Sequence, residues 1–413
     1  MPPAPDLARA FAPEWLPKIA DSGLAPLRLA GRQLLPIVQG GMGVGVSAHR
    51  LAGAVAAQGG IGTLSSVDLR RHHPDLMART SGLSQRAGMD ADTKAQIDAA
   101  NLEALEREVR GARAAAGGLG LIAMNVMRAV SDYAAYVRRS LEAGVDMVVV
   151  GAGLPLDLPE LAADHPKALL VPILSDARGV SLLVRKWERK KRLPDAIVLE
   201  HPRLAGGHLG AAKIADLNDP RFDFERAIPE SLAFLRQAGL ERELPLIAAG
   251  GIRCCEDIAR IQALGGAGVQ LGTPFAVTTE GDASDGFKRV LAEARDEDMV
   301  EFTSVAGLPA RAVATPWLKA YLKIESKLQA VAHPKSRCTK AFDCLAQCGL
   351  RDGHADWGQF CIDNQLAAAL RGDLKKALYF RGVGALPFGA QIRSVRELVE
   401  RLLTRGAPVP LPA

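Results

Sequence analysis

The chain has 413 residues, of which 48% are hydrophobic, 23% charged and 5% aromatic. This balance is typical of a globular protein with a sizeable core, and it excludes a disordered chain. The net charge of +5 is spread over the whole length apart from one dense basic run, 185–192 (RKWERKKR), so no nucleic-acid partner is expected.

Short aliphatic runs alternate with longer stretches of helical periodicity through the first 280 residues, which is the pattern of repeated β-α units around a parallel sheet. The runs are continuously apolar, so both faces of each strand should be covered, as in a barrel inside a ring of helices. The sequence therefore predicts an α/β fold, a (β/α)8 TIM barrel. The eight expected strands are 35–39, 61–64, 121–125, 147–150, 169–174, 196–199, 246–249 and 268–271.

Two segments interrupt or follow this alternation. A charged helical pattern within 68–118 predicts an inserted helical segment over the barrel mouth. After residue 280 the alternation stops and helical patterns dominate. We therefore expect a barrel domain over 1–280, insertion included, and a mainly helical C-terminal appendage over 281–413 with a Cys-rich patch at 338–361.

The first expected strand runs into a glycine-rich segment, 39–45 (QGGMGVG). Its continuation 43–48 (GVGVSA) imitates a dinucleotide-binding fingerprint, with Asp68 about 20 residues on. A doubly wound sheet would leave eight β-α units and the glycines of the last two strands unexplained. We therefore favour a flat glycine surface for a planar ring such as a flavin, formed by Gln39, Gly40, Gly41 and Met42.

His208 lies between glycines in 205–210 (AGGHLG), on the longest loop expected at the barrel mouth. A neutral imidazole accepts a proton near neutral pH, which suits abstraction from carbon next to an electron-withdrawing group. We therefore predict His208 as the catalytic base. Glu200 and His201 lie nearer the strand end, where they could orient His208 or contact the cofactor.

Glycines also follow the last two expected strands. Glycines let backbone N–H groups approach a ligand closely, and the loops after strands seven and eight of such barrels commonly bind phosphate. The sequence therefore predicts a phosphate-bearing cofactor, held by Gly250, Gly251, Gln270, Leu271, Gly272 and Thr273.

Five motifs, taken in order, resemble the nitronate monooxygenase family, formerly called 2-nitropropane dioxygenases. They are QGGMG (39–43), Asn125, AGGH (205–208), AAGGI (248–252) and QLGT (270–273), and the similarity extends through GLPAR (307–311). The resemblance implies a non-covalent FMN, held by residues that include Asn125, Gly206 and Gly207, with His208 as catalytic base. It also implies oxidation of alkyl nitronates, or of nitroalkanes, by dioxygen to carbonyl compounds and nitrite.

The sequence departs from the family pattern just before the histidine. The family usually has Gln-Gly-x-Glu-Ala-Gly-Gly-His, whereas HPRL (201–204) precedes Ala205 here. The glutamine contact to the flavin is therefore lost, or supplied by Glu200 or His201. Related FMN-dependent enoyl-acyl-carrier-protein reductases and NAD(P)H:quinone reductases share the barrel and the Gly-Gly-His loop. An NAD(P)H-dependent reductase of quinones or enoyl thioesters is the alternative function, and a non-enzymatic phosphate-ligand barrel is a third.

Four of the six cysteines cluster late in the chain. Four thiolates could hold an iron–sulfur cluster or zinc, because soft ligands suit both. The spacing matches neither a zinc ribbon nor a ferredoxin run, so buried unbonded thiols are the alternative. The four residues are Cys338, Cys344, Cys348 and Cys361.

No apolar stretch approaches the roughly 18 residues that a membrane span requires, and the first residues lack a secretory signal pattern. Six cysteines are too few for a disulfide scaffold. We therefore expect a cytoplasmic enzyme without a membrane partner, acting on a small-molecule substrate and dioxygen. The sequence leaves a homo-oligomer open.

Overall fold

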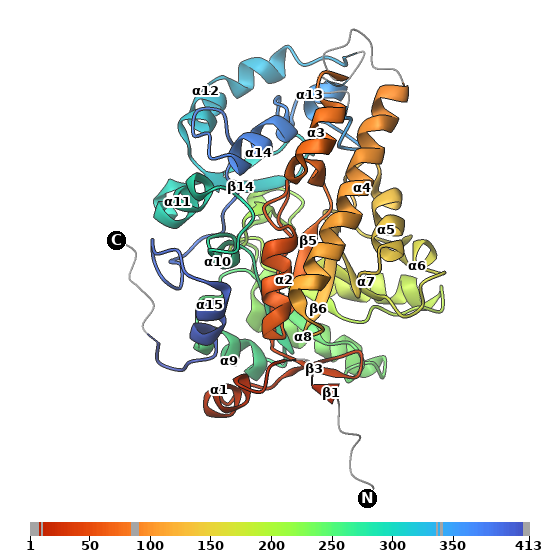
Figure 1. The fold of residues 1–413 in the computed structure, drawn as a ribbon, viewed down its shortest axis with the longest axis vertical. Coiled ribbons are helices and arrows are strands. Elements are labelled where there is room, and N and C mark those ends of the chain that lie inside the picture. The colour runs from red at the N-terminus through yellow and green to blue at the C-terminus, as the bar shows by residue number, and fades with distance from the viewer. Residues whose placement is uncertain (1–7, 10, 84–90, 336–337, 339–341, 408–413) are drawn as a thin grey trace, which may run out of the picture.

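A computed structural model describes residues 8–9, 11–83, 91–335, 338 and 342–407. Its centre is a closed barrel of eight parallel strands, in the order β11-β12-β4-β5-β6-β7-β8-β9 (Figure 1). The predicted TIM barrel is thus confirmed, and each expected strand agrees with an observed one to within two residues at either end. The barrel strands are β4 (Ile37–Gln39), β5 (Ile61–Ser65), β6 (Leu121–Met127), β7 (Met147–Gly151), β8 (Leu169–Leu174), β9 (Ile197–Glu200), β11 (Leu246–Ala249) and β12 (Gly268–Leu271).

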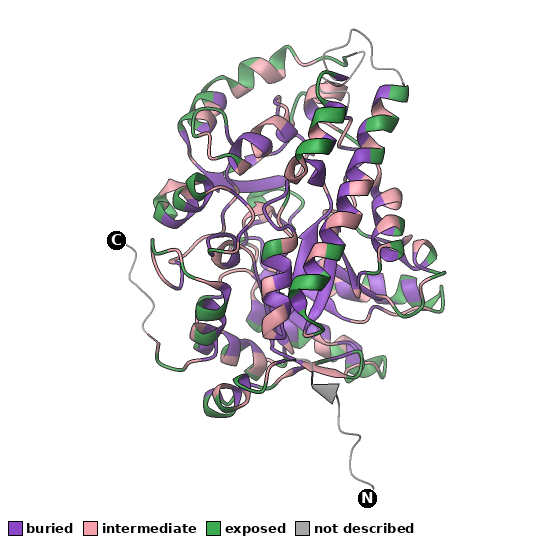
Figure 2. Cartoon of the chain, in the orientation of Figure 1, coloured by how far each residue is buried: buried purple, intermediate pink, exposed green. Residues whose placement is uncertain are grey.

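Side chains fill the barrel from the inside, because alternate residues of every strand point inward. Val38, Val149 and Val198 belong to this inner cluster, and Figure 2 shows most of the barrel strands buried. The same cluster includes leucines of the hairpin β2 (Leu27–Leu29) and β3 (Arg32–Leu34), which the short strand β1 (Ala8–Arg9) extends. This hairpin closes the amino-terminal end of the barrel and leaves the carboxyl-terminal end for a ligand.

Helices surround the barrel and cover its outer face (Figure 1). In chain order, the helices up to β12 are α1 (Trp15–Ser22), α2 (His49–Gln58), η1 (Leu69–His72), α3 (Pro74–Thr80), α4 (Ala91–Ala116), α5 (Tyr133–Glu142), α6 (Leu158–Leu161), α7 (Ala177–Glu188), η3 (Ile214–Asp216), η4 (Pro220–Phe222), α8 (Phe224–Gln237) and α9 (Cys255–Ala263). Those after β12 are α10 (Thr273–Ala276), α11 (Asp285–Glu293), η5 (Asp296–Asp298), α12 (Pro316–Ala330), α13 (Gly349–Asp352), α14 (Ile362–Leu370) and α15 (Val395–Leu402).

The segment 68–118 contributes to the barrel wall as well as to its mouth. Its long helix α4 packs along α2 and α5 and serves as the barrel's second outer helix. The preceding helix η1 contacts the C-terminal region instead, since Arg71 Nη2 lies 2.8 Å from Asp363 Oδ2 of α14.

The C-terminal region contains a small antiparallel sheet besides its helices. Strands β13 (Met299–Thr303) and β14 (Pro309–Val313) pair with β10 (Gly207–His208), which lies in the loop after β9. The final helix α15 returns to the barrel, where it packs against α2, α9 and α10 in the place of an eighth outer helix. A division of the chain at residue 280 into two domains stays a prediction.

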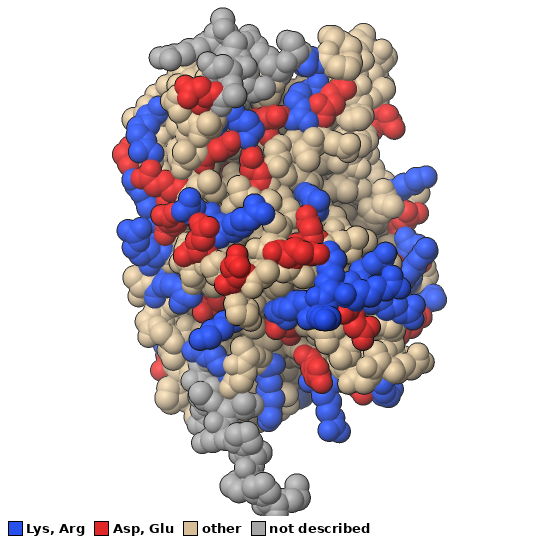
Figure 3. All heavy atoms as spheres, turned by 90° about the vertical axis from the view of Figure 1, so that its right-hand side faces the viewer, with Lys and Arg blue, Asp and Glu red and all other residues tan. Residues whose placement is uncertain are grey.

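Lys and Arg gather on the side of the molecule that carries α5, α6 and α7 (Figure 3). The basic run 185–192 begins within α7 and is largely exposed apart from the buried Trp187. Two of its cations are paired: Lys190 with Glu160, and Arg192 with Asp195 at 2.5 Å. The run is therefore a solvated, partly ion-paired surface. Among the described residues, no helix has both the length and the apolar character needed to cross a membrane.

Candidate active site

A cavity of about 550 Å³ lies at the carboxyl ends of the barrel strands, between the barrel and the C-terminal region, and its size suits a small molecule. His208 lines it together with every predicted cofactor residue except Gln39. These lining residues are Gly40, Gly41, Met42, Asn125, Glu200, Gly206, Gly207, Gly250, Gly251, Gln270, Leu271, Gly272 and Thr273. The barrel thus brings residues from the ends of five different strands to one site.

The loop after β4 forms one wall, and its glycines allow polar side chains to approach it. A Cβ atom on Gly41 would lie 2.3 Å from Cβ of Asn125, and one on Gly40 would lie 3.3 Å from the Gln270 side chain. Any larger residue at position 41 would displace Asn125. The Asn125 side chain makes no hydrogen bond with the described residues, so its amide is available to a ligand in the cavity.

Gln39 does not reach the cavity, contrary to the prediction. Its side chain is fully buried, accepts a hydrogen bond from the Thr63 N–H (2.8 Å) and donates one to the Thr63 carbonyl (3.0 Å). As the last residue of β4, it follows the inward-facing Val38 and ties this strand to β5. Gln39 therefore supports the glycine loop and leaves ligand contact to its neighbours.

The glycines after β11 and β12 form the adjoining wall, because β12 pairs with β4. Gly250 and Gly251 have left-handed backbone conformations, with φ of 108° and 73°, which let the chain turn directly beneath the cavity. The loop 381–384 of the C-terminal region covers this turn, and the Gly382 N–H donates to Thr273 Oγ1 (3.2 Å). A Cβ on Gly206 would lie 2.2 Å from the carbonyl carbon of Arg381, so the two regions meet here without room for a side chain.

His208 is held by the sheet that joins the barrel to the C-terminal region. Its backbone pairs with Ala310 of β14, and its Nε2 lies 3.0 Å from Oγ of Ser304. Ser304 is fully buried and also accepts a hydrogen bond from the Ala306 N–H (3.2 Å). Burial lowers the pKa of His208 to about 4, so the imidazole is neutral at physiological pH and able to accept a proton.

A buried arginine fixes the loop that leads to His208. Arg311 of β14 donates to the Pro202 carbonyl (3.1 Å) and to the Ala205 carbonyl, and it pairs with Glu301. Because its guanidinium is rigid and planar, one side chain sets two points of this loop. Arg311 therefore acts on the position of His208 through the backbone.

Glu200 and His201 have different surroundings. Glu200 lines the cavity, and burial alone raises its pKa to about 7. The His201 ring lies outside the cavity wall, where Nε2 is 3.2 Å from Asp223 Oδ1 and Nδ1 accepts from the Arg203 N–H (3.3 Å). Both nitrogens of His201 are thus occupied, which leaves Glu200 as the residue of this pair that can contact a ligand.

The cysteines do not form a metal centre in the described part of the chain. Within it, no group of three or more His, Cys, Asp or Glu residues is arranged to hold a metal ion. Cys338, Cys344, Cys348 and Cys361 are each neither fully buried nor exposed. Burial raises the pKa of Cys344 and Cys348, which keeps them as neutral thiols. The predicted iron–sulfur or zinc site is therefore not supported.

Several residues of the site escaped the sequence analysis: Ser304, Arg311, Phe380 and the loop 381–384. They reach the cavity through contacts between segments about 100 or more residues apart, which no local pattern reports. The glycines in 382–384 (GVG) were the one usable signal, because paired glycines mark a close backbone approach.

Comparison with known proteins gives a consistent picture. The family model described as nitronate monooxygenase matches residues 32–405. A probable nitronate monooxygenase of Bacillus subtilis is 26% identical over 74% of this chain and 84% of its own length. The match to a probable nitronate monooxygenase of Staphylococcus saprophyticus is 29% identical but spans 28% of this chain and 30% of that protein. A Mycobacterium tuberculosis protein, the (3aS,4S,5R,7aS)-5-hydroxy-7a-methyl-1-oxo-octahydro-1H-indene-4-carboxyl-CoA dehydrogenase, is 28% identical over 52% of this chain and 61% of its own.

Two solved structures are similar in fold. FabK from Thermotoga maritima superposes with a TM-score of 0.60 at 19% identity, covering 94% of each chain. Nitroalkane oxidase from Streptomyces ansochromogenes superposes with a TM-score of 0.57 at 19% identity, covering 93% of this chain and 96% of the other. At this identity the likeness concerns the barrel and its C-terminal region, and not the substrate.

Proposed function

The chain belongs to the nitronate monooxygenase family of FMN-dependent oxidoreductases, and from this premise we propose that it oxidises alkyl nitronates with dioxygen to carbonyl compounds and nitrite. The observation that carries the proposal is the position of His208. A neutral, half-buried imidazole, backed by Ser304 at 3.0 Å, lies in the same cavity as the glycine walls expected to hold the cofactor.

The residues present fit FMN. The turn at Gly250 and Gly251 offers close backbone approach, as a phosphate group requires, and Thr273 begins the short helix after β12. Gly40 and Gly41 leave a flat surface beside the free amides of Asn125 and Gln270, which suits the polar edge of a flavin ring. When bound, FMN would supply the one-electron chemistry that links the substrate to dioxygen.

In this proposal His208 removes the proton from the carbon that bears the nitro group when the substrate arrives as a neutral nitroalkane. That role requires the tautomer in which Nε2–H donates to Ser304 Oγ, which leaves Nδ1 free to accept the proton. A substrate that is already a nitronate has lost this proton, so His208 then serves to bind and orient the anion.

The test is turnover under air with purified, FMN-loaded protein. An alkyl nitronate should give nitrite in proportion to the oxygen consumed, without added NADH or NADPH. Absence of nitrite with every nitronate tried, in protein that retains FMN, would refute the proposed reaction.

A second candidate function is an NAD(P)H-dependent reductase of quinones or enoyl thioesters. The relative that is named as a coenzyme A thioester dehydrogenase favours it. Glu200 favours it as well, because its raised pKa keeps the carboxyl partly protonated near neutral pH, able to supply the proton that a substrate takes up on reduction. Steady NADH or NADPH oxidation that depends on a quinone or an enoyl thioester would support this function.

A further inference from the structure

The wall of the cavity that lies outside the glycine loops is largely apolar. Its apolar residues come from the barrel rim, the turn before β14, α14 and the segment after α14. Six apolar residues of this wall, here called the apolar chamber, are neither fully buried nor exposed to the outside: Val67, Met127, Ile173, Leu308, Leu366 and Phe380.

Partial exposure of apolar side chains inside a cavity carries a cost, because their surface meets water rather than other protein atoms. In a packed interior such side chains would be fully covered, as most of the barrel core is. Phe380 also places its ring 5.6 Å from that of His208, so the apolar chamber begins at the catalytic histidine. A ligand at His208 would therefore cover this surface with its own apolar part.

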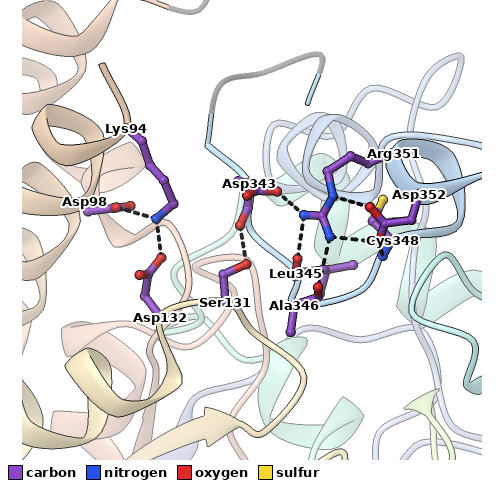
Figure 4. Close-up of polar contacts among 10 residues, drawn as sticks. All are labelled: Lys94, Asp98, Ser131, Asp132, Asp343, Leu345, Ala346, Cys348, Arg351 and Asp352. Atoms are coloured by element: carbon purple, nitrogen blue, oxygen red, sulfur yellow. Dashed lines mark hydrogen bonds and ion pairs between the residues drawn. The ribbon is translucent and has the colours of Figure 1, made fainter. Parts of the chain in front are cut away.

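The chamber has a fixed wall. The segment 343–346 runs antiparallel to the loop after β6, where Ala346 N–H donates to the Ala129 carbonyl (2.9 Å) and Ser131 N–H donates to that of Cys344 (3.2 Å). Figure 4 shows Ser131 joined to Asp343, and Arg351 joined to Asp343, Asp352 and the carbonyls of Leu345 and Ala346. Pocket residues Val130 and Leu345 face each other across this contact. These contacts join the C-terminal region to the barrel rim beside the chamber.

Most of the charged groups that line the cavity already have protein partners. Asp363 Oδ2 accepts from Arg71 (2.8 Å), Asp176 accepts from the Gly179 N–H (2.7 Å), and Arg253 lies 3.8 Å from Asp257. Arg381 donates to the carbonyls of Leu291, Gly382 and Gly384, so its donors are already engaged. Glu200 has no such partner among the described residues, and in its ionised form it would repel a carboxylate on a substrate.

We propose that the apolar chamber selects substrates that carry a long, uncharged alkyl or alicyclic group on the reacting carbon, and that it rejects small nitroalkanes and chains ending in a carboxylate. This inference rests on the proposed function, because it names the class of nitronate that the site takes.

The test compares 1-nitroalkane nitronates from ethyl to octyl on the FMN-loaded protein. Each buried methylene contributes about 0.8 kcal/mol, so kcat/KM should rise roughly fourfold per carbon until the chamber is full. An octyl chain with a terminal carboxylate should lose on the order of 100-fold, since a buried, unpaired charge is costly. Equal kcat/KM for ethyl and octyl nitronates, or for the neutral and carboxylate chains, would overturn the proposal.

Variants that fill the chamber test whether the dependence of kcat/KM on chain length arises there. Leu366→Trp fills the space from α14 and should reduce kcat/KM for the octyl nitronate at least roughly tenfold, with the ethyl value nearly unchanged. Leu374→Trp is the matched control, because this leucine is 48% exposed and lies outside the cavity wall. Met127→Trp, on the barrel side of the chamber, is a second filling variant if Leu366→Trp does not fold.

A binding experiment separates failure of the chamber from failure of the proposed reaction. If no nitronate is oxidised, the melting temperature is measured with 1-alkanols from butanol to octanol, since a ligand that binds the folded state raises it. Stabilisation that grows with chain length and disappears in Leu366→Trp would support the chamber. Stabilisation independent of chain length would overturn it.

Discussion

The barrel rim and the C-terminal region meet at His208, and they contribute different kinds of groups. The rim supplies glycines and backbone, at Gly41, Gly206 and Gly251, in positions set by the strand register. The C-terminal region supplies side chains, with Ser304 on the imidazole and Phe380 beside it. Backbone groups suit a constant cofactor, whereas side chains suit a substrate that differs between relatives.

This division explains how one barrel could serve several reactions. The cofactor walls depend on main-chain geometry, which substitutions change little. The chamber depends on side chains, most of them in loops or in the short helix α14, which can be exchanged without altering the barrel. We therefore expect substitutions at the rim to affect FMN binding or the chemical step, and substitutions in the C-terminal region to affect orientation and selectivity.

The largest effect is expected at the rim. His208→Asn should lower kcat/KM for neutral nitroalkanes by roughly 10²–10⁴-fold, the usual contribution of a general base, because asparagine cannot take the proton. Oxidation of preformed nitronates should fall much less. Steady-state kinetics with each substrate form, on protein with full FMN content, measure the difference.

The low pKa of His208 also predicts how kcat/KM of the wild type depends on pH. Because burial lowers the pKa of His208 to about 4, its base form persists throughout the range above that value. The acid limb of kcat/KM for a neutral nitroalkane should therefore appear near pH 4, well below the ordinary histidine range. An acid limb near pH 6.5 would show that the imidazole is exposed to water in the working enzyme.

A smaller effect is expected from the C-terminal region. Ser304→Ala removes the hydroxyl 3.0 Å from His208 Nε2 and should lower nitroalkane kcat/KM roughly tenfold through loss of the correct tautomer. Ser304→Thr, which keeps the hydroxyl, should restore most of the activity. A merely structural role would change the melting temperature of Ser304→Ala and leave its nitroalkane-to-nitronate ratio unaltered.

The smallest effect concerns Glu200. Its raised pKa of about 7 means that it is neutral below this pH and becomes an anion above it. Nitronate KM should therefore rise as pH increases through 7, by a few-fold, and Glu200→Gln should abolish this rise.

The raised pKa of Glu200 also affects stability. The folded state loses stability as pH rises from 4.5 to 7, since the unfolded chain ionises this carboxyl more readily, and Glu200→Gln should remove that loss.

Sequence patterns predicted the parts of the site that follow strands directly. Eight apolar runs gave the barrel, and a barrel places residues such as Asn125, His208 and Gly251 on one face. Gln39 shows the limit of this reasoning, because the side-chain alternation along β4 turns it toward Thr63 although its neighbour Gly40 lines the cavity.

The rest of the site and fold depends on contacts between residues that are distant in sequence. Ser304 lies on a hairpin that reaches His208 through pairing of β10 with β14, and nothing near residue 304 reports that pairing. Helix α15 likewise completes the barrel from the far end of the chain. The clustering of four late cysteines suggested a metal site, yet no group of three or more potential metal ligands comes together among the described residues.

The central claim is that a nitronate, and not a nicotinamide, donates electrons to the cofactor. It is tested most directly by mixing FMN-loaded protein, without oxygen, with an alkyl nitronate or with NADH or NADPH while flavin absorbance is followed. The account predicts loss of absorbance with the nitronate and none with either nicotinamide on the timescale of turnover. Rapid loss with NADH or NADPH, and none with the nitronate, would contradict it.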